Sequence, residues 1–345
     1  MHEIKENTEI PIRHARILRG PTQLAFDITN KCNLNCLHCF NRSNENSKVS
    51  DELSDREVIN FIKDVIKMKP HNICICGGEP TLRFNLLCQI SRMLSSNGIM
   101  VSLVTNGLSM TSEKALLLKE SGVERIQVSL DGATDKTHET LRIAKGSFNK
   151  AIEAIKIFKE MKIKEVGVAF TPTKFNCEEL EKIFELCKSL GVNIFRVQPL
   201  MILGRARSNV ENILPSEFQY RNLVRKINEL KYYNKEPIIQ WGDPIDHLIR
   251  FRTTAQHMVS FLTIQANGDI VVSPYLPISV GNIRKNSIIK YWEKGLPRIW
   301  ENDFVKNIAS RIMCISDFGK EHKGLPIVWF DENIRYDLIK DKVFS

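Results

Sequence analysis

Short apolar runs alternate with longer amphipathic stretches between residues 22 and 205. The runs are rich in β-branched and aromatic residues, which predicts strands at 23–29, 72–76, 100–105, 125–130, 165–170 and 193–198. The stretches between them place apolar side chains on one helical face, most clearly at 51–68, 147–161 and 178–190. Strands alternating with helices predict a parallel sheet with right-handed crossovers. Spacing alone leaves open whether this sheet is open and doubly wound or forms an incomplete barrel.

The pattern changes after residue 205. Residues 215–232 predict one long helix, and apolar runs at 261–265 and 269–273 flank the turn residues 266–268, as in a hairpin. A short helix ending at Tyr291 and Trp292 follows. We therefore expect an N-terminal segment at 1–21, a main α/β domain at 22–210 and a smaller α+β region at 211–345. Residues 211–345 by themselves would bury a smaller hydrophobic core than the main domain.

The composition excludes several classes of protein. Of the 345 residues, 43% are apolar and 26% charged, which suits a globular protein with a full-sized core. No stretch approaches the roughly 18 apolar residues of a membrane helix. The N-terminal residues lack the apolar segment of a secretory signal, so we expect a cytoplasmic protein without membrane contact. The net charge of +9 comes from Lys and Arg interspersed with Glu, as on a solvated surface. We expect no nucleic-acid partner, although an acidic peptide would suit this charge.

Three of the nine cysteines form a C-x3-C-x2-C cluster directly after the first predicted strand, at Cys32, Cys36 and Cys39. The carboxyl end of that strand is the edge where α/β sheets bind ligands. Three cysteines suit a [4Fe–4S] cluster that has one iron without a protein ligand. Zinc would need a fourth donor, and His38 would need an awkward turn to supply it. The pattern therefore favours an iron–sulfur cluster.

The other cysteines are scattered along predicted elements. Cys74 and Cys76 share one face of the second strand beside Gly77, where they could face the lumen of a barrel. We expect them to be small buried packing residues instead. A second group of cysteines lies on apolar helical faces, and we expect these to be buried in the core: Cys88, Cys177 and Cys187.

Short motifs at successive strand ends give the chain a resemblance to the radical S-adenosylmethionine (SAM) superfamily over residues 22–210. After the cysteine cluster come GGEP at 77–80, VTNG at 104–107, SLDG at 129–132, LR at 141–142 with GSF at 146–148, and PL at 199–200 with GRA at 204–206. The resemblance implies a partial (β/α)6 TIM-type barrel, one [4Fe–4S] cluster and SAM. In that family the cluster reduces SAM, and the resulting 5′-deoxyadenosyl radical abstracts a substrate hydrogen.

The same resemblance assigns the cofactor contacts. Cys32, Cys36 and Cys39 would hold the cluster, and Glu79 with its loop would receive the SAM amino group. An Arg fork suits a carboxylate, and glycines let a ligand approach the backbone. The remaining SAM candidates are the close-approach residues Gly77 and Gly78, Ser129 and Arg142 for the carboxylate and ribose, Asn106 as a further polar contact, Leu200 and Met201 beside the adenine, and His38 where the family has an aromatic flanking the adenine.

Residues 268–274, 281–283, 287–288 and 291–292 resemble the C-terminal region of SPASM and twitch enzymes, which modify ribosomal peptides. In those enzymes further cysteines hold auxiliary clusters. Here Ser273 stands near the expected cysteine, and Cys314 is the one cysteine after Cys187. We therefore expect a SPASM-like extension without auxiliary clusters.

A missing auxiliary cluster constrains the reaction, because forming a cross-link or double bond removes two electrons from the substrate. Epimerisation of an amino acid needs no net oxidation, but it needs a donor for the returning hydrogen. A thiol is suitable because its S–H bond is weak, and Cys314 is the leading candidate for this catalytic role. We therefore favour a radical SAM enzyme that epimerises a ribosomally synthesised peptide.

Three alternatives stay open. The chain could cross-link a peptide through C–C, C–O or thioether bonds, it could modify a small molecule, or it could be a non-catalytic Fe–S binding module. The expected partners are a ribosomal precursor peptide, with or without a separate leader-binding protein, and an electron donor such as flavodoxin or ferredoxin. The sequence does not identify the substrate, the modified residue or the oligomeric state.

Overall fold

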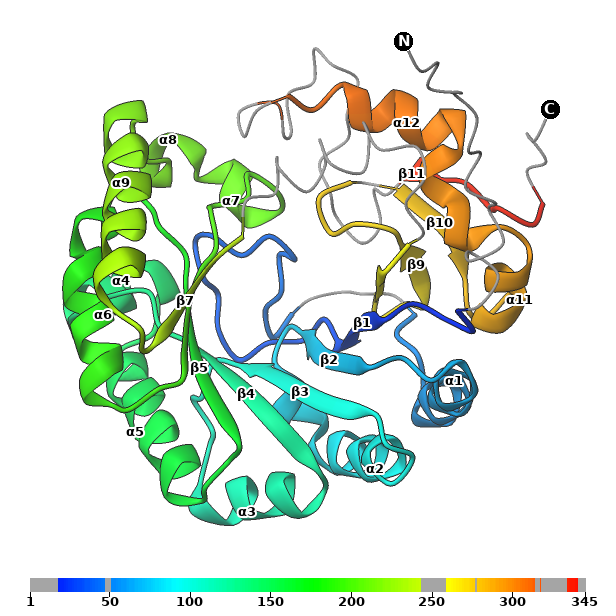
Figure 1. The fold of residues 1–345 in the computed structure, drawn as a ribbon, viewed down its shortest axis with the longest axis horizontal. Helices are drawn as coiled ribbons and strands as arrows, with labels where there is room; N and C mark the ends of the chain where they lie inside the picture. Colours follow the sequence, from blue (N-terminus) through cyan, green and yellow to red (C-terminus); the bar gives the residue numbers. More distant parts are fainter. Residues whose placement is uncertain are drawn as a thin grey trace, which may run out of the picture.

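The computed structural model describes residues 18–46, 51–242, 259–276, 278–313, 317 and 334–340. Its strands form one sheet in the order β11-β10-β9-β8-β1-β2-β3-β4-β5-β6-β7. The barrel strands pair in parallel in chain order and curve around a lumen (Figure 1). They are β1 (Gln23–Thr29), β2 (Asn72–Gly77), β3 (Met100–Thr105), β4 (Val123–Ser129), β5 (Glu165–Phe170), β6 (Ile194–Val197) and β7 (Ile238–Trp241).

Helices connect these strands and cover the outer side of the curved sheet (Figure 1). Outward-facing strand residues such as Phe26 and Ile75 are fully buried against them. Helix α1 begins at a capping box, in which Ser54 and Glu57 satisfy each other's backbone N–H groups. The helices are α1 (Asp55–Met68), α2 (Phe84–Ser95), α3 (Ser112–Glu120), α4 (Asp135–Arg142), α5 (Ser147–Glu160), α6 (Leu180–Ser189), the short α7 (Arg205–Ser208) and α8 (Val210–Ile213), and α9 (Glu217–Tyr233).

The C-terminal region continues the same sheet. The predicted hairpin is confirmed as β8 (Phe261–Ile264) and β9 (Asp269–Val271), and β8 adds in parallel to β1. Strands β10 (Ile278–Asn282) and β11 (Ile334–Arg335) extend it, with helices α11 (Ile288–Glu293) and α12 (Asp303–Ser310) packed nearby (Figure 1). Arg284 ties this region to α1, donating to Glu57 Oε1 at 2.6 Å and to the Asp51 carbonyl at 2.7 Å. The extension and barrel therefore share one sheet and one core.

The predicted fold class is confirmed, since a partial barrel carries a smaller C-terminal extension. Strands β1, β3 and β5 have the predicted bounds, and the long helix predicted at 215–232 is α9. Strand β7 was not predicted, because it has only four residues and only Ile239 among them is buried. The domain boundary at residue 210 stays a prediction, while the parallel sheet continues beyond it through β7. No helix among the described residues is long and apolar enough to cross a membrane.

Candidate active site

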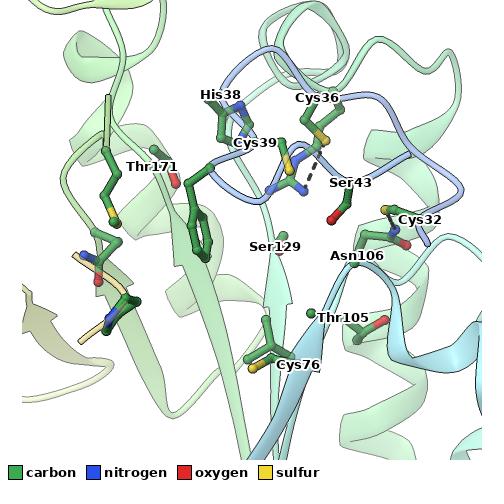
Figure 2. Close-up of a pocket in the computed structure, with 18 of the residues that line it drawn as sticks. Cys32, Cys36, His38, Cys39, Ser43, Cys76, Thr105, Asn106, Ser129 and Thr171 are labelled. Carbon is green, nitrogen blue, oxygen red and sulfur yellow. Dashed lines mark hydrogen bonds between the residues drawn. The ribbon is translucent and has the colours of Figure 1, made fainter. Parts of the chain in front are cut away.

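A cavity of about 320 Å³ lies at the carboxyl ends of the barrel strands (Figure 2). The loop after β1 forms one wall, and Pro274 and Tyr275 of the C-terminal extension form part of another. The structure brings together ten of the residues that the sequence singles out, and these line the cavity: Cys32, Cys36, His38, Cys39, Gly77, Gly78, Asn106, Ser129, Arg142 and Met201.

The three cysteines of the first loop converge on the cavity from one side (Figure 2). Cys32 and Cys36 are buried and Cys39 is half-buried, and all three are free thiols. Arg205, which follows β6, anchors this loop. Its Nε donates to the Cys36 carbonyl at 2.7 Å, and its backbone N–H donates to the Cys39 carbonyl at 2.9 Å. The GRA motif thus has a structural role in holding the cysteine loop.

Asp131 is a buried site residue to which sequence reasoning gave no role, although it belongs to the SLDG motif. Its Oδ2 accepts from Arg142 Nε at 2.7 Å and Nη2 at 2.6 Å, and lies 3.1 Å from His38 Nε2. Burial by itself would raise the pKa of the Asp131 carboxyl, but Arg142 and His38 hold that pKa well below its usual range. An ionised Asp131 therefore fixes the guanidinium of Arg142.

Two histidines lie beside Asp131 and differ in their hydrogen bonds. His138 Nδ1 accepts the backbone N–H of Asp131 at 3.1 Å, and burial lowers the pKa of His138 to about 4, so its ring is neutral. His38 Nδ1 is buried and has no hydrogen-bond partner among the described residues. Since buried polar atoms are normally paired, an open nitrogen on the cavity wall fits a site for a ligand.

Glu79 is fully buried, and its carboxylate does not line the cavity. One oxygen accepts from Thr81 Oγ1 at 2.6 Å and Thr105 Oγ1 at 2.8 Å, and the other accepts from the backbone N–H of Asn106 at 2.8 Å. The carboxylate therefore ties the GGEP loop to the end of β3. That this loop receives the SAM amino group stays a prediction, and the loop's backbone is the part positioned to make the contact.

Comparison with known proteins bears directly on this arrangement. Residues 26–187, which include the cysteine loop and the motifs at the ends of β2, β3 and β4, match the Radical SAM superfamily. This chain therefore carries a radical SAM region at residues 26–187.

Relatives of this radical SAM protein include enzymes of two kinds. It is 28% identical to an AdoMet-dependent heme synthase of Methanosarcina barkeri over 298 residues, which cover 80% of this chain and 83% of that protein. It is 27% identical to the sporulation killing factor maturation protein SkfB of Bacillus subtilis over 278 residues, 78% of this chain and 64% of that one. SuiB of Streptococcus suis, solved with S-adenosylmethionine, shares the fold with a TM-score of 0.65 at 17% identity, covering 87% of this chain and 70% of SuiB.

The cofactors of this radical SAM protein are a [4Fe–4S] cluster and SAM, and the donor set fits them. Asn106 Nδ2 lies 3.8 Å from Cys32 Sγ, and Arg142 Nη1 lies 3.8 Å from Cys36 Sγ, as N–H donors to cluster sulfurs should. Burial raises the pKa of Cys32 to about 12, so a thiolate there needs the positive charge of a metal. No group of three His, Cys, Asp or Glu side chains in the described ranges is arranged to hold a single metal ion.

The glycines of the GGEP loop permit a close backbone approach in this radical SAM fold. Gly77 has φ +119°, and a Cβ there would collide with the Thr29 carbonyl. We expect Gly77→Ala to lower the unfolding free energy by about 1–3 kcal/mol more than Gly146→Ala. Gly146 also has positive φ, +82°, but open space around the position of its Cβ, so it reports backbone strain alone. Anaerobic thermal unfolding and iron content would measure the difference; equal effects of the two variants would contradict it.

The remaining predicted residues are placed differently. Leu200 does not line the cavity and packs instead in an apolar cluster with Leu141, Ala206 and Ile213, while its neighbour Met201 does line it. Cys314 lies outside the described residues.

The scattered cysteines divide into two groups. The predicted core positions Cys88, Cys177 and Cys187 are confirmed as buried. The expectation that Cys76 is a packing residue is wrong, because it lies on the lumen side of β2 and lines the cavity. The large outward-facing residues Ile73 and Ile75 fill the helix–sheet interface and turn the smaller thiols inward.

Proposed function

We propose that this radical SAM enzyme modifies a ribosomally synthesised peptide without net oxidation, by epimerising one of its residues. When bound, the cluster and SAM supply a carbon-centred radical that abstracts a hydrogen atom from the substrate. The chain's own residues bind and orient the cofactor and the peptide. A one-electron donor of the flavodoxin or ferredoxin class would reduce the enzyme.

The redox-neutral proposal rests on how few cysteines the C-terminal extension has. Ser273 stands where SPASM enzymes have a cysteine, and it is fully buried, with its Oγ accepting the backbone N–H of Tyr275 at 3.2 Å. It thus shapes a turn that lines the cavity. Cys314 alone follows Cys187 in the sequence, and one cysteine does not hold a cluster. This supports an enzyme without a second iron–sulfur acceptor for an electron from the substrate.

The cavity supports a peptide as the substrate. Its volume of about 320 Å³ is at the lower end of the roughly 300–1,000 Å³ of small-molecule pockets. A space of this size leaves little room for a large macrocycle beside SAM. Gln198 Nε2, which lies 3.2 Å from Tyr275 Oη, joins the barrel wall to the extension at this point and gives it a polar edge. The similarity to SkfB, a maturation protein, agrees with this choice.

Particular residues would orient the cofactor. Asp131 holds the guanidinium of Arg142 at the cavity wall, where two charge-assisted bonds limit its rotation. His38 Nδ1 is an unpaired polar atom of another cavity-lining residue, and Gly78 lines the cavity while its missing Cβ lets the loop pack against the Lys31 carbonyl. These groups fix one end of the cavity, so that the reacting atoms meet the substrate at the other end.

Product mass tests this proposal. We would co-express the enzyme with each short peptide encoded beside its gene, and then repeat the reaction in D2O with reduced, reconstituted enzyme and SAM. Epimerisation is expected to leave the peptide mass unchanged in H2O and to add one deuterium per event in D2O. A product that lacks two hydrogens would contradict epimerisation and establish cross-linking or desaturation instead.

A tetrapyrrole substrate is the second candidate, because the Methanosarcina barkeri heme synthase matches over most of both chains. Titrating the reconstituted enzyme with an iron porphyrin would distinguish the two. The peptide proposal predicts no saturable shift of the porphyrin absorption band. A stoichiometric shift, together with porphyrin-dependent SAM cleavage, would favour the tetrapyrrole.

A further inference from the structure

The barrel lumen contains a thiol and carboxylate cluster below the cofactor loop. Asp27 on β1 is in register with Cys76 on β2, and Cys76 Sγ donates to Asp27 Oδ1 at 3.3 Å. Cys74 lies on the same face of β2, and Cys76 Sγ also lies 3.8 Å from the Cys74 carbonyl oxygen. Asp27 is only 5% exposed. None of these groups has a part in holding the cluster.

Of the two thiols, Cys76 is the one that reaches the cavity. In Figure 2 the three cluster cysteines lie at one side of the cavity and Cys76 lies at the other, at the end of β2. A ligand held by the cysteine loop would therefore have this thiol on its far side. Cys88 and Cys187, in contrast, are buried among apolar residues of the core outside the cavity.

The lumen side of the sheet also carries a buried hydroxyl. Thr263 on β8 is in register with Ala25, so both face the lumen side of the sheet with Asp27. Its hydroxyl is buried and has no hydrogen-bond partner within the described ranges. Thr263 does not line the cavity, so of these groups the Cys76 thiol is the one that a ligand in the cavity would meet.

The surroundings keep the Cys76 thiol protonated. Its interaction with Cys74, burial and the nearby Asp27 carboxylate all raise the pKa of Cys76. Burial also raises the pKa of Asp27 to about 7, so this carboxyl carries a proton for part of the time at neutral pH. A protonated thiol has a hydrogen atom to give, whereas a thiolate does not.

We propose that Cys76 is the catalytic thiol that returns a hydrogen atom to the substrate radical from the floor of the cavity, and that Asp27 is its positioning residue. This inference rests on the proposed redox-neutral function. It places the donor opposite the cofactor loop, which is the placement that inversion at a carbon centre requires, because one hydrogen leaves on one face and another arrives on the opposite face.

The step balances in atoms and electrons. A carbon-centred substrate radical takes a hydrogen atom from Cys76, so a C–H bond forms and the S–H bond breaks, leaving a thiyl radical. The thiyl radical accepts one electron from the same class of one-electron donor that reduces the enzyme. It accepts one proton from Asp27, which regains a proton from solvent. The substrate has lost one hydrogen atom and gained one, with no net oxidation.

A deuterium test needs no knowledge of the substrate. Reduced, reconstituted enzyme is given SAM in D2O, where thiols exchange to S–D. Without substrate, the radical in the cavity is expected to take deuterium from Cys76, so 5′-deoxyadenosine becomes monodeuterated. In Cys76→Ala and Cys76→Ser this label is expected to fall to background. Deuterium is counted per molecule of 5′-deoxyadenosine, so a change in turnover does not affect the result.

Matched variants identify the source of the label. Cys88→Ala removes a thiol from the core and is expected to leave the label unchanged. Cys74→Ala should retain it, because Cys74 does not line the cavity. Retention of the label in both Cys76 variants overturns the proposal, and so does its loss in Cys314→Ala alone. If wild-type enzyme does not cleave SAM at all, the proposed function fails rather than this inference.

A second readout does not depend on turnover. The unreduced, reconstituted enzyme is treated with iodoacetamide, and the labelled cysteines are identified by peptide mass spectrometry. Because its thiol is protonated, Cys76 is expected to react slowly, but faster than Cys187, whose pKa burial also raises and which does not line the cavity. Saturating SAM is expected to slow the reaction of Cys76 further. If Cys76 is as inert as Cys187, or if SAM has no effect on it, the proposed position of the thiol is wrong even where a variant yields no 5′-deoxyadenosine.

Discussion

Replacing Cys32, Cys36 and Cys39 together by alanine is expected to remove all bound iron and to abolish SAM cleavage. The wild-type chain should bind about four irons after anaerobic reconstitution with iron and sulfide. The three thiols face one cavity, and no other cysteine in the described ranges is part of this loop. Iron and sulfide per chain, together with 5′-deoxyadenosine formation, measure the effect.

The control for this experiment removes the same number of thiols from the core. The triple variant Cys88→Ala, Cys177→Ala, Cys187→Ala deletes buried side chains that do not line the cavity. It should keep its iron, although it loses some stability because small cavities form. Iron retained by the first triple variant would reveal a second cluster. A second cluster could accept an electron from the substrate, so peptide cross-linking would then be favoured over epimerisation.

Asp131→Ala is expected to lower the free energy of unfolding by about 3–5 kcal/mol. Asp131 is fully buried, and its removal leaves the guanidinium of Arg142 without its buried counter-charge. The same change frees His38, whose Nε2 lies 3.1 Å from the carboxylate. Anaerobic denaturant unfolding of the full chain would measure the loss of stability. The affinity for SAM is also expected to fall, because the cavity wall loses its fixed cation.

Two further variants separate the causes. Asp64→Ala breaks an exposed pair with Lys67, 3.1 Å apart, and should cost about 0–1 kcal/mol. The double variant Asp131→Leu, Arg142→Met removes both charges and should recover much of the stability without recovering SAM binding. If Asp131→Ala costs no more than Asp64→Ala, the buried pair does not organise the site as described.

The sequence by itself determined the parallel α/β arrangement, and its resemblance to the radical SAM superfamily implied the partial barrel and the cofactor centre. Strand alternation placed β1, β3 and β5 at their observed bounds, since the apolar runs are short and bordered by turn residues. Apart from LR at 141–142 and GSF at 146–148, the motifs follow strands, and the carboxyl ends of parallel strands meet at one edge. The ordered motifs therefore brought the residues of one cavity together without any knowledge of tertiary contacts.

Only the tertiary structure decided which side chains face one another. Asp131, Arg142 and His38 are separated in sequence, and their network exists because α4 returns beside the cysteine loop. The sequence named the motif but not the pairing.

The same limit applies to the lumen. In the run from Asn72 to Cys76 the isoleucines and the cysteines are all apolar, so strand periodicity does not tell the inner face from the outer face. The helices packed outside the barrel settled the question, because the larger Ile73 and Ile75 fill that interface completely. The smaller thiols Cys74 and Cys76 were left facing inward, where Cys76 reaches the cavity.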